Sequence, residues 1–231
     1  MSIDYIISQS LQISQPDEGF RFGSDSLVLA WFATVKPKER IIDICSGSGV
    51  LSVLLAERKQ VCDIVAVELQ DEMFKHLEDT ININKLGNVI KAVHQDIKTY
   101  KPDNEFNMAI CNPPYRAMGS GRLSSDTGKQ QARFDVELSL DELLAFCKKY
   151  IFFGGRLALS GVTDRLATTI NACISYNFEP KKLAFLYPAV DRKPKIFFLE
   201  CAHGALSGGL QVCEPIVQNT ALYEDIINGR W

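Results

Sequence analysis

The chain has 231 residues, of which 46% are hydrophobic and 23% are charged, and its formal net charge is −3. This length and apolar content predict one domain with one sizeable core. The slightly acidic balance excludes a protein whose whole surface attracts nucleic acid, so a polyanionic partner must meet local basic patches.

The chain carries no sequence signal for a membrane segment or a metal site. No apolar stretch is long enough to span a bilayer, and the N-terminal residues lack the pattern of a signal peptide, so we expect a cytoplasmic protein. The 7 cysteines include no C-x-x-C pair, and the 3 histidines are scattered without ligand spacing. We therefore expect reduced, buried thiols and no metal ion.

The first predicted helix follows a loop that carries aromatic residues. Glycines break this loop between Gln15 and Ser24, and it contains two phenylalanines. Ser24 is expected to cap a helix that continues to Phe32, because a serine side chain accepts hydrogen bonds from the first N–H groups of a helix. On this pattern alone, the segment is a capped helix that packs on the edge of a sheet.

The stretch from Ile41 to Val50 predicts a strand, a glycine turn and the start of a helix. Its short, nearly continuous apolar run indicates a strand buried on both faces. Gly47 and Gly49 lack Cβ atoms, so the backbone can approach a ligand, and the following helix offers unpaired N–H groups. Ser52 stands where a dinucleotide-binding turn has its third glycine, and no phosphate-loop motif occurs. The turn therefore predicts a site for carboxylate or hydroxyl oxygens, although a tight turn in an α/β core has the same pattern.

Two further strands lead to acidic residues. The second strand ends at Glu68, at the distance where an acid that binds a ribose is expected after such a turn. An amphipathic helix is predicted over 71–86, and a third strand over 89–95 leads to Asp96. An acid at the end of that strand equally suits a simple turn.

A fourth strand over 106–111 precedes the run Asn112-Pro113-Pro114-Tyr115. The alternation of strands and helices predicts a parallel sheet with right-handed crossovers. Ligands of such sheets bind beyond the carboxyl ends of the strands, where the strand order reverses. If the reversal lies between the first and fourth strands, the glycine turn and this tetrapeptide face each other across one crevice.

The tetrapeptide can hold a planar amine. The Asn112 side-chain oxygen and the Pro113 carbonyl can accept the two amine hydrogens, and two prolines keep these carbonyls out of a helix. Tyr115 can stack on the flat face of a base. A rigid turn at the end of a strand is the alternative interpretation.

The segment over 116–134 loses all periodicity and is rich in glycine, serine and basic residues. Long segments of this kind in compact domains are functional or disordered. We expect it to order on RNA, and a solvated loop without a ligand is the alternative. Its candidate RNA contacts are Arg116, Arg122, Lys129 and Arg133.

The C-terminal part predicts a helix over 138–152, a strand over 156–160 and two strands over 183–187 and 196–201. The short connection between the last two implies an antiparallel hairpin. If the strand before the connection is parallel to the sheet, basic residues at the tip border the ligand site, although they also suit the protection of a sheet edge. These residues are Arg192, Lys193 and Lys195.

The motifs, in this order, resemble the class I S-adenosylmethionine-dependent methyltransferases. The run Gly19-Phe20-Arg21-Phe22-Gly23-Ser24-Asp25 resembles a signature of the bacterial valine-tRNA adenine-N6 methyltransferase family. The resemblance implies an α/β fold: a doubly wound, mostly parallel, seven-stranded Rossmann-like sheet with a C-terminal antiparallel hairpin. It implies a single methyltransferase domain over 1–231, with a cofactor-closing segment at 1–39, a core at 40–204 and a tail at 205–231.

The resemblance also implies the cofactor, S-adenosyl-L-methionine, and the residues that contact it. The implied catalytic residues are Asn112, Pro113, Pro114 and Tyr115. The implied cofactor-binding residues are Phe22, Gly23, Asp25, Asp43, Ser46, Gly47, Gly49, Glu68, Leu69, Asp96, Ile97 and Asn112. The implied reaction is methylation of the exocyclic N6 amine of an adenosine in tRNA, with the anticodon-loop adenosine of valine tRNA as target, by a monomeric enzyme.

The chain departs from this family after the basic segment, where Phe134 and Asp135 stand in place of histidine and glutamate, and its tail lacks a clear match. A protein glutamine-N5 methyltransferase is one alternative. The short segment before the first sheet strand argues against it. A ribosomal guanine-N2 methyltransferase is another, but such families more often have phenylalanine in place of Tyr115. An inactive RNA-binding module is the third, and the presence of Asp43, Glu68 and Asn112 argues against it.

Overall fold

The computed structural model describes residues 2–7, 10–17, 21–113 and 138–231. Some of the predicted site residues lie outside this described part of the chain. They are Pro114, Tyr115, Arg116, Arg122, Lys129 and Arg133.

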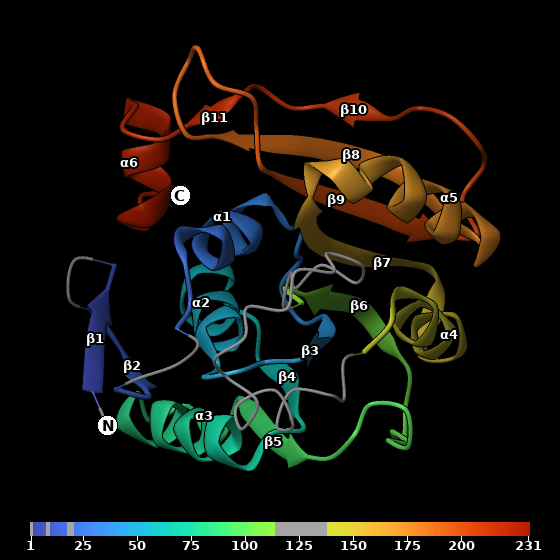
Figure 1. The fold of residues 1–231 in the computed structure, drawn as a ribbon. Helices are drawn as coiled ribbons and strands as arrows, with labels where there is room; N and C mark the ends of the chain where they lie inside the picture. The colour runs from blue at the N-terminus through green and yellow to red at the C-terminus, as the bar shows by residue number, and fades with distance from the viewer. Residues whose placement is uncertain (1, 8–9, 18–20, 114–137) are drawn as a thin grey trace, which may run out of the picture.

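Nine strands of the described residues form one central sheet, in the order β10-β8-β9-β7-β6-β3-β4-β5, with β11 also paired to β8 (Figure 1). Every pairing is parallel except the two that involve β9. The expected mostly parallel sheet with a C-terminal antiparallel hairpin is therefore confirmed for the seven long strands, and two short strands from the tail extend it. The strands are β3 (Arg40–Ile44), β4 (Asp63–Glu68), β5 (Ile90–His94), β6 (Phe106–Cys111), β7 (Ile151–Val162), β8 (Phe178–Tyr187), β9 (Ile196–His203), β10 (Gln211–Val212) and β11 (Ile216–Val217).

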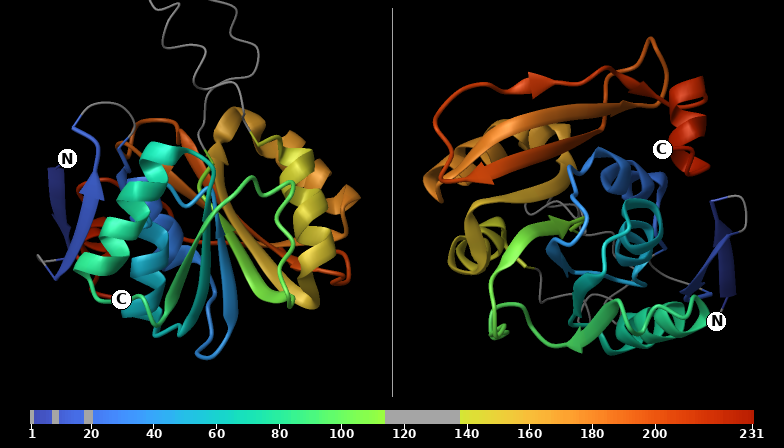
Figure 2. Two further views of the ribbon diagram at one scale, coloured as in Figure 1. Left: turned by 90° about the horizontal axis from the view of Figure 1, so that it is seen from below. Right: turned by 180° about the vertical axis from the view of Figure 1, so that it is seen from behind.

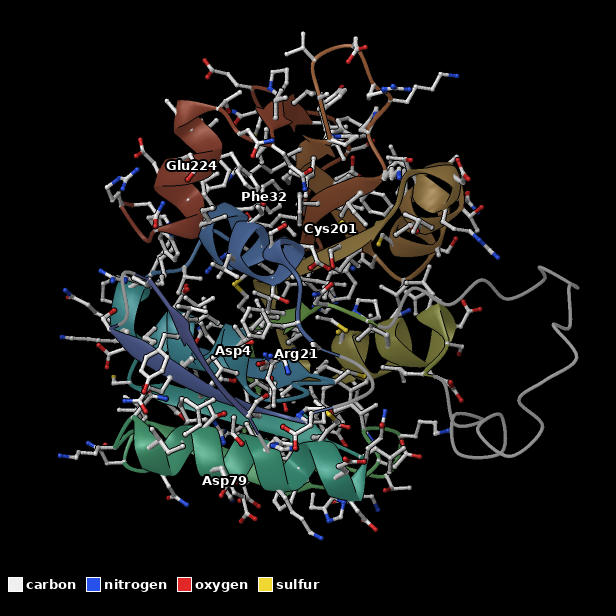
Figure 3. All side chains as sticks on the ribbon, turned by 60° about the vertical axis from the view of Figure 1, so that its left-hand side comes forward. Asp4, Arg21, Phe32, Asp79, Cys201 and Glu224 are labelled. Atoms are coloured by element: carbon white, nitrogen blue, oxygen red, sulfur yellow. The ribbon has the colours of Figure 1, made fainter. Side chains whose placement is uncertain are left out.

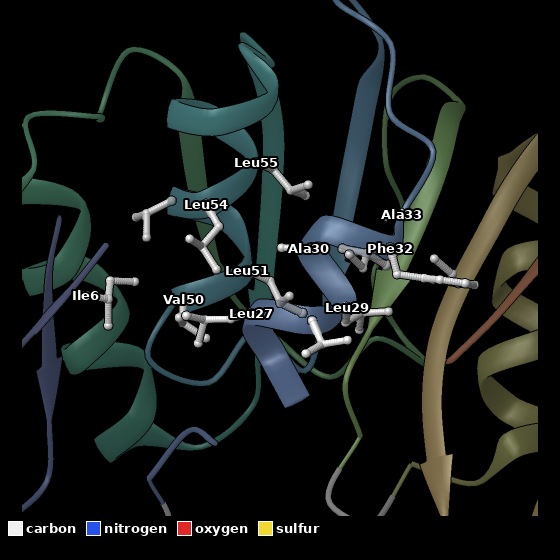
Figure 4. Close-up of a cluster of buried hydrophobic side chains, with 14 of the residues drawn as sticks. Ile6, Leu27, Leu29, Ala30, Phe32, Ala33, Val50, Leu51, Leu54 and Leu55 are labelled. Carbon is white, nitrogen blue, oxygen red and sulfur yellow. The ribbon is translucent and has the colours of Figure 1, made fainter. Parts of the chain in front are cut away.

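Helices cover both faces of the sheet, as Figure 2 shows edge-on. Successive residues of a strand face opposite sides, so the apolar run of β3 sends Ile41 into one core cluster and Ile42 into the other. The first cluster also contains apolar residues of the three N-terminal helices, and Figure 4 labels those of the first two. The second cluster contains apolar residues of the two helices after β6. The helices are α1 (Ser24–Phe32), α2 (Val50–Lys59), α3 (Asp71–Ile83), α4 (Leu140–Tyr150), α5 (Leu166–Ser175) and α6 (Ala221–Ile227), with a 3-10 turn at Thr163–Arg165.

The ends of two helices differ from the sequence expectation. Gly23, not Ser24, is the N-cap of α1, and Ser24 is its first helical residue. Helix α3 stops at Ile83 rather than at residue 86, since the Asn84 side chain donates to the Thr80 carbonyl and the next residue, Lys85, has a φ of 58°.

The N-terminal residues form a two-stranded hairpin of β1 (Ser2–Ile6) and β2 (Leu11–Gln15) that packs on α3. The Ser14 backbone N–H donates to Thr80 Oγ1 at 3.0 Å, and the Ser14 hydroxyl contacts His76 Nδ1 at 2.7 Å. Arg21 forms an ion pair with Asp4 at 2.6 Å, and Figure 3 labels both residues. The hairpin thus links the segment before α1 to α3, the helix that follows β4.

The tail, for which the sequence predicted no structure, folds onto the β8 edge of the sheet. Both β10 and β11 pair with β8, and α6 packs on α1 through the buried side chains of Tyr223 and Ile226. The indole N–H of Trp231 donates to the Ile226 carbonyl at 2.8 Å. Within the described ranges, no helix combines the length and apolar character needed to cross a membrane.

Candidate active site

The glycine turn lies between β3 and α2, as the sequence predicted. Gly47 and Gly49 have φ values of 55° and 83°, which lie in the left-handed region that favours glycine. A Cβ atom on Gly49 would lie 2.6 Å from Leu77 Cδ1, so a larger residue would clash with α3. The Ser46 backbone N–H donates to the Val67 carbonyl at 3.1 Å, which fixes the turn against β4.

Glu68 joins the glycine turn to the start of α3. Its side chain is 5% exposed, and Oε2 accepts a hydrogen bond from the Gly47 N–H at 2.8 Å. Its Oε1 accepts from the backbone N–H groups of Leu69 and Gln70, at 3.0 and 2.9 Å. The predicted neighbourhood of this acid and the glycine turn is therefore present, and contact with a ribose stays a prediction.

Asp43 is a buried carboxyl group behind the turn. Its Oδ2 accepts a hydrogen bond from the Ser52 hydroxyl at 2.7 Å, whereas Oδ1 has no hydrogen-bond partner within the described structure. Burial raises the pKa of Asp43 to about 7, and the nearby charge of Glu68 acts in the same direction while the Ser52 hydrogen bond opposes it. The Ser46 hydroxyl is likewise buried without a described partner. Such polar atoms next to a glycine turn fit S-adenosylmethionine, which carries amino, carboxylate and hydroxyl groups.

Asn112 leaves the sheet beside this turn. β6 pairs in parallel with β3, and Cys111 lies opposite Ile44, so both chains emerge at the same edge. The Asn112 Nδ2 donates to Asp25 Oδ2 at 3.1 Å and to Ser26 Oγ at 2.8 Å, and its Oδ1 accepts from the Ser160 hydroxyl at 2.5 Å. Pro113, the next residue, is half-buried. The order of strands thus brings the predicted amide and the predicted cofactor turn together.

Helix α1 supplies one wall of this arrangement. Asp25 and Ser26, in its first turn, contact Asn112, whereas Phe22 and Gly23 line a hollow of about 390 Å³ together with Tyr5 and Tyr223. The backbone N–H of Phe22 donates to Gln15 Oε1 at 2.9 Å. The described structure therefore places Asp25 in the Asn112 cluster, and Phe22 and Gly23 at a hollow that β1 and α6 also line.

The other predicted cofactor residues have structural roles of their own. Asp96 Oδ1 accepts from the Lys98 backbone N–H at 2.9 Å, and the two side chains form an ion pair, so this acid shapes the turn after β5. Ile97 is 6% exposed and packs in the second core cluster, while Leu69 is 38% exposed. Contacts of these residues with a cofactor stay predictions.

The basic hairpin tip lies on the same edge as the glycine turn. β8 is antiparallel to β9, which is antiparallel to β7, so β8 runs with the parallel strands and its connection leaves at their carboxyl ends. The Thr163 N–H, just after β7, donates to the Lys195 carbonyl at 3.0 Å. Arg192, Lys193 and Lys195 are all exposed there.

Sequence reasoning missed three serines of the site: Ser26, Ser52 and Ser160. Ser160 is 1% exposed near the end of β7, and its one local sequence signal was a polar residue directly after the apolar run Leu157–Leu159. Its relation to Asn112 depends on the pairing register of β6 and β7, which no motif encodes. Within the described residues, no group of three or more histidine, cysteine, aspartate or glutamate side chains could hold a metal ion.

Comparison with known proteins finds methyltransferases. The family model for the methyltransferase small domain matches residues 18–128. A crystal structure described as a predicted O-methyltransferase from Agrobacterium tumefaciens has a TM-score of 0.70 at 18% identity, covering 89% of this chain and 96% of that one. A methyltransferase from Pyrococcus furiosus has a TM-score of 0.62 at 18% identity, covering 84% and 90%. Residues 18–128 therefore match a methyltransferase domain in sequence, and the fold of the chain is that of these solved methyltransferase structures.

Among curated proteins, the chain is similar to several named tRNA1(Val) (adenine(37)-N6)-methyltransferase. The one from Tolumonas auensis is 33% identical over 65% of this chain and 63% of its own length. The one from Aliivibrio salmonicida is 30% identical over 60% and 58%, and the one from Parabacteroides distasonis is 24% identical over 78% and 76%. The chain thus spans less than two thirds of the first two relatives.

Proposed function

We propose that this chain transfers a methyl group from S-adenosylmethionine to the exocyclic N6 amine of an adenosine in tRNA, with the anticodon-loop adenosine of valine tRNA as the target. The observation that carries the proposal is the oriented Asn112 carboxamide, at the end of the strand next to the glycine turn. The names of the bacterial relatives support tRNA as the substrate, and such a substrate implies a cytoplasmic enzyme.

The chemistry requires positioning rather than a dedicated base. The lone pair of an adenine amine is delocalised into the ring, so the amine is a poor nucleophile. Asn112 Oδ1 and the Pro113 carbonyl would accept its two hydrogens and direct the lone pair at the methyl group. The cofactor, when bound, supplies a methyl group on a positively charged sulfur. The proton leaves to water after transfer.

The cofactor would lie against the glycine turn. The buried carboxyl groups of Asp43 and Glu68 and the buried hydroxyl of Ser46 belong to this turn or to the strands that meet it. Gly47 and Gly49 keep the backbone open to a close approach. These residues would bind the amino acid and ribose parts of the cofactor and leave its methyl group toward Asn112.

The substrate base must leave its stack to reach Asn112, which favours an adenosine in an unpaired loop. The exposed cations at the β8–β9 connection would contact the RNA backbone near the site, since phosphate contacts position a nucleic acid without reading its sequence. These cations are Arg192, Lys193 and Lys195.

Mass spectrometry of nucleosides tests the proposal directly. Valine tRNA without modifications is incubated with the protein and S-adenosylmethionine, and N6-methyladenosine is the expected product. Replacement of the target adenosine by guanosine and the Asn112→Ala variant are the matched controls, and neither should give product. If a protein glutamine gained the methyl group and the tRNA gained none, the result would support a protein glutamine-N5 methyltransferase and overturn the tRNA assignment.

A further inference from the structure

We propose that Asp25 and Ser160 are positioning residues that determine which way the Asn112 carboxamide faces. A carboxamide has two ends of nearly equal shape, one donor and one acceptor, and only the acceptor end can receive a hydrogen of the substrate amine. The inference rests on the proposed function for its catalytic consequence, and on hydrogen-bond geometry for the orientation itself.

The sheet places Ser160 next to Asn112. Cys111 pairs with Leu159 across β6 and β7, so the following residues, Asn112 and Ser160, are neighbours. Ile110 and Ala158 belong to the core cluster on the α1 face, and Cys111 and Leu159 belong to the cluster on the opposite face. Because side chains alternate along a strand, Asn112 and Ser160 both return to the face that α1 covers.

Asp25 selects one of the two amide orientations. A carboxylate can only accept hydrogen bonds, so Nδ2 of Asn112 must face Asp25 Oδ2, from which it lies 3.1 Å away. The reversed amide would place two acceptor oxygens against each other. The hydroxyl of Ser26, 2.8 Å from Nδ2, can accept or donate and so does not discriminate.

Ser160 completes the selection on the other end of the amide. Its hydroxyl donates to Asn112 Oδ1 at 2.5 Å and is almost fully buried, so no water competes for it. An amide oxygen has two lone-pair sites, and this bond occupies one. A hydrogen of the substrate amine would approach this oxygen in the direction that the Ser160 bond sets. Ser160 thereby fixes the direction of the acceptor without contacting the substrate.

Two features of α1 hold Asp25 in place. A Cβ on Gly23 would lie 2.5 Å from Asp25 Oδ1, so the absent side chain leaves room for the carboxylate above the first turn. At the other end of α1, Lys182 Nζ donates to the Phe32 carbonyl at 2.7 Å, and the Thr34 N–H donates to Glu200 Oε2 at 2.7 Å. The helix is thus anchored to β8 and β9, and its first turn meets Asn112.

The experiment compares Ser160→Ala, Ser160→Thr and Asp25→Ala with the wild type. Single-turnover methyl transfer should fall roughly 10- to 100-fold in Ser160→Ala and Asp25→Ala, since a misplaced acceptor costs this much. In Ser160→Ala, cofactor affinity should stay within about twofold. Ser160→Thr, which keeps the hydroxyl and suits a strand, should recover most of the rate. Ser14→Ala removes another buried serine hydroxyl, from the Ser14–His76 pair, and is the control for a general loss of packing.

A nitrogen-15 NMR spectrum reads the orientation itself. The Asn112 side-chain amide signals, assigned by their absence in Asn112→Ala, should exchange slowly with water in the wild type and at least about tenfold faster in Ser160→Ala and Asp25→Ala. Unchanged amide signals in both variants, or an unchanged transfer rate in Ser160→Ala, would overturn the inference. The spectra report the orientation of the Asn112 amide even if the protein methylates no RNA. A negative NMR result is therefore distinct from a failure of the proposed function.

Discussion

Glu68 Oε2 accepts a hydrogen bond from the Gly47 N–H at 2.8 Å, so the acid at the end of β4 fixes the glycine turn at the end of β3. The other carboxylate oxygen accepts from two N–H groups at the start of α3. The carboxylate is therefore a structural link as well as a candidate ligand for the cofactor, and the two roles can be separated by substitution.

Glu68→Ala is expected to weaken the binding of S-adenosylmethionine at least tenfold and to lower the free energy of unfolding by about 1–3 kcal/mol, because buried N–H groups lose their acceptors. Glu68→Gln should lower cofactor affinity and the free energy of unfolding nearly as much, since the NH₂ end of the glutamine must face one of the backbone donors. Calorimetric titration and urea unfolding measure the two effects.

Glu39→Ala is the matched control for Glu68. It removes a carboxylate that accepts from the Lys36 backbone N–H and pairs with Arg156, just before β3 and so at the opposite end of that strand from the glycine turn. It should cost about 1 kcal/mol of stability and leave cofactor affinity intact. Equal cofactor affinity in Glu68→Ala and the wild type would show that Glu68 does not contribute to cofactor binding.

Asn112→Ala is expected to lower methyl transfer at least about 100-fold, because the acceptor for the amine is lost, while cofactor affinity changes less than about threefold. Rapid-quench kinetics with labelled cofactor and tRNA measure the rate, and calorimetry measures the affinity. A parallel loss of rate and cofactor affinity would show that the side chain serves the cofactor rather than the amine.

The site was predictable from the sequence where the signal is local. The glycine turn, Glu68 and Asn112 each stand directly after a short apolar run, and the parallel sheet then brings the strand ends together. Ser160 was not predictable, because its role depends on the register between two strands that are far apart in sequence. The tail was missed for another reason: two-residue strands such as Gln211–Val212 are too short to show periodicity.

Charge reversal of both Arg192 and Lys193 to glutamate is expected to weaken tRNA binding and to reduce the slope of log affinity against log salt by about 1.5 to 2, as expected for two lost phosphate contacts. Filter binding at several salt concentrations measures the slope. Lys148 and Lys149 are exposed just before β7 begins, at the opposite edge of the sheet, and their reversal is the control. The same slope for both double variants would exclude the hairpin tip as an RNA contact.

Asp43 predicts a pH dependence of stability with a defined sign. Burial raises its pKa from 3.8 to about 7, so the native state binds the proton more tightly than the unfolded state does. This group therefore favours folding fully below about pH 4, and the contribution is lost as pH rises toward 7, after which it is constant.

Asp43→Asn removes this titration. The free energy of unfolding of the variant, minus that of the wild type, should rise with pH between about 4 and 7 by at most about 1.4 kcal/mol per pH unit, and should be flat above pH 7. Urea unfolding of both proteins at pH 4.5, 5.5, 6.5 and 7.5 measures it, and taking the difference cancels the other titrating groups. Parallel stability curves over this range would mean that Asp43 remains ionised when buried. In that case, its unpartnered Oδ1 would have to be satisfied by a group outside the described residues, by water or by a ligand.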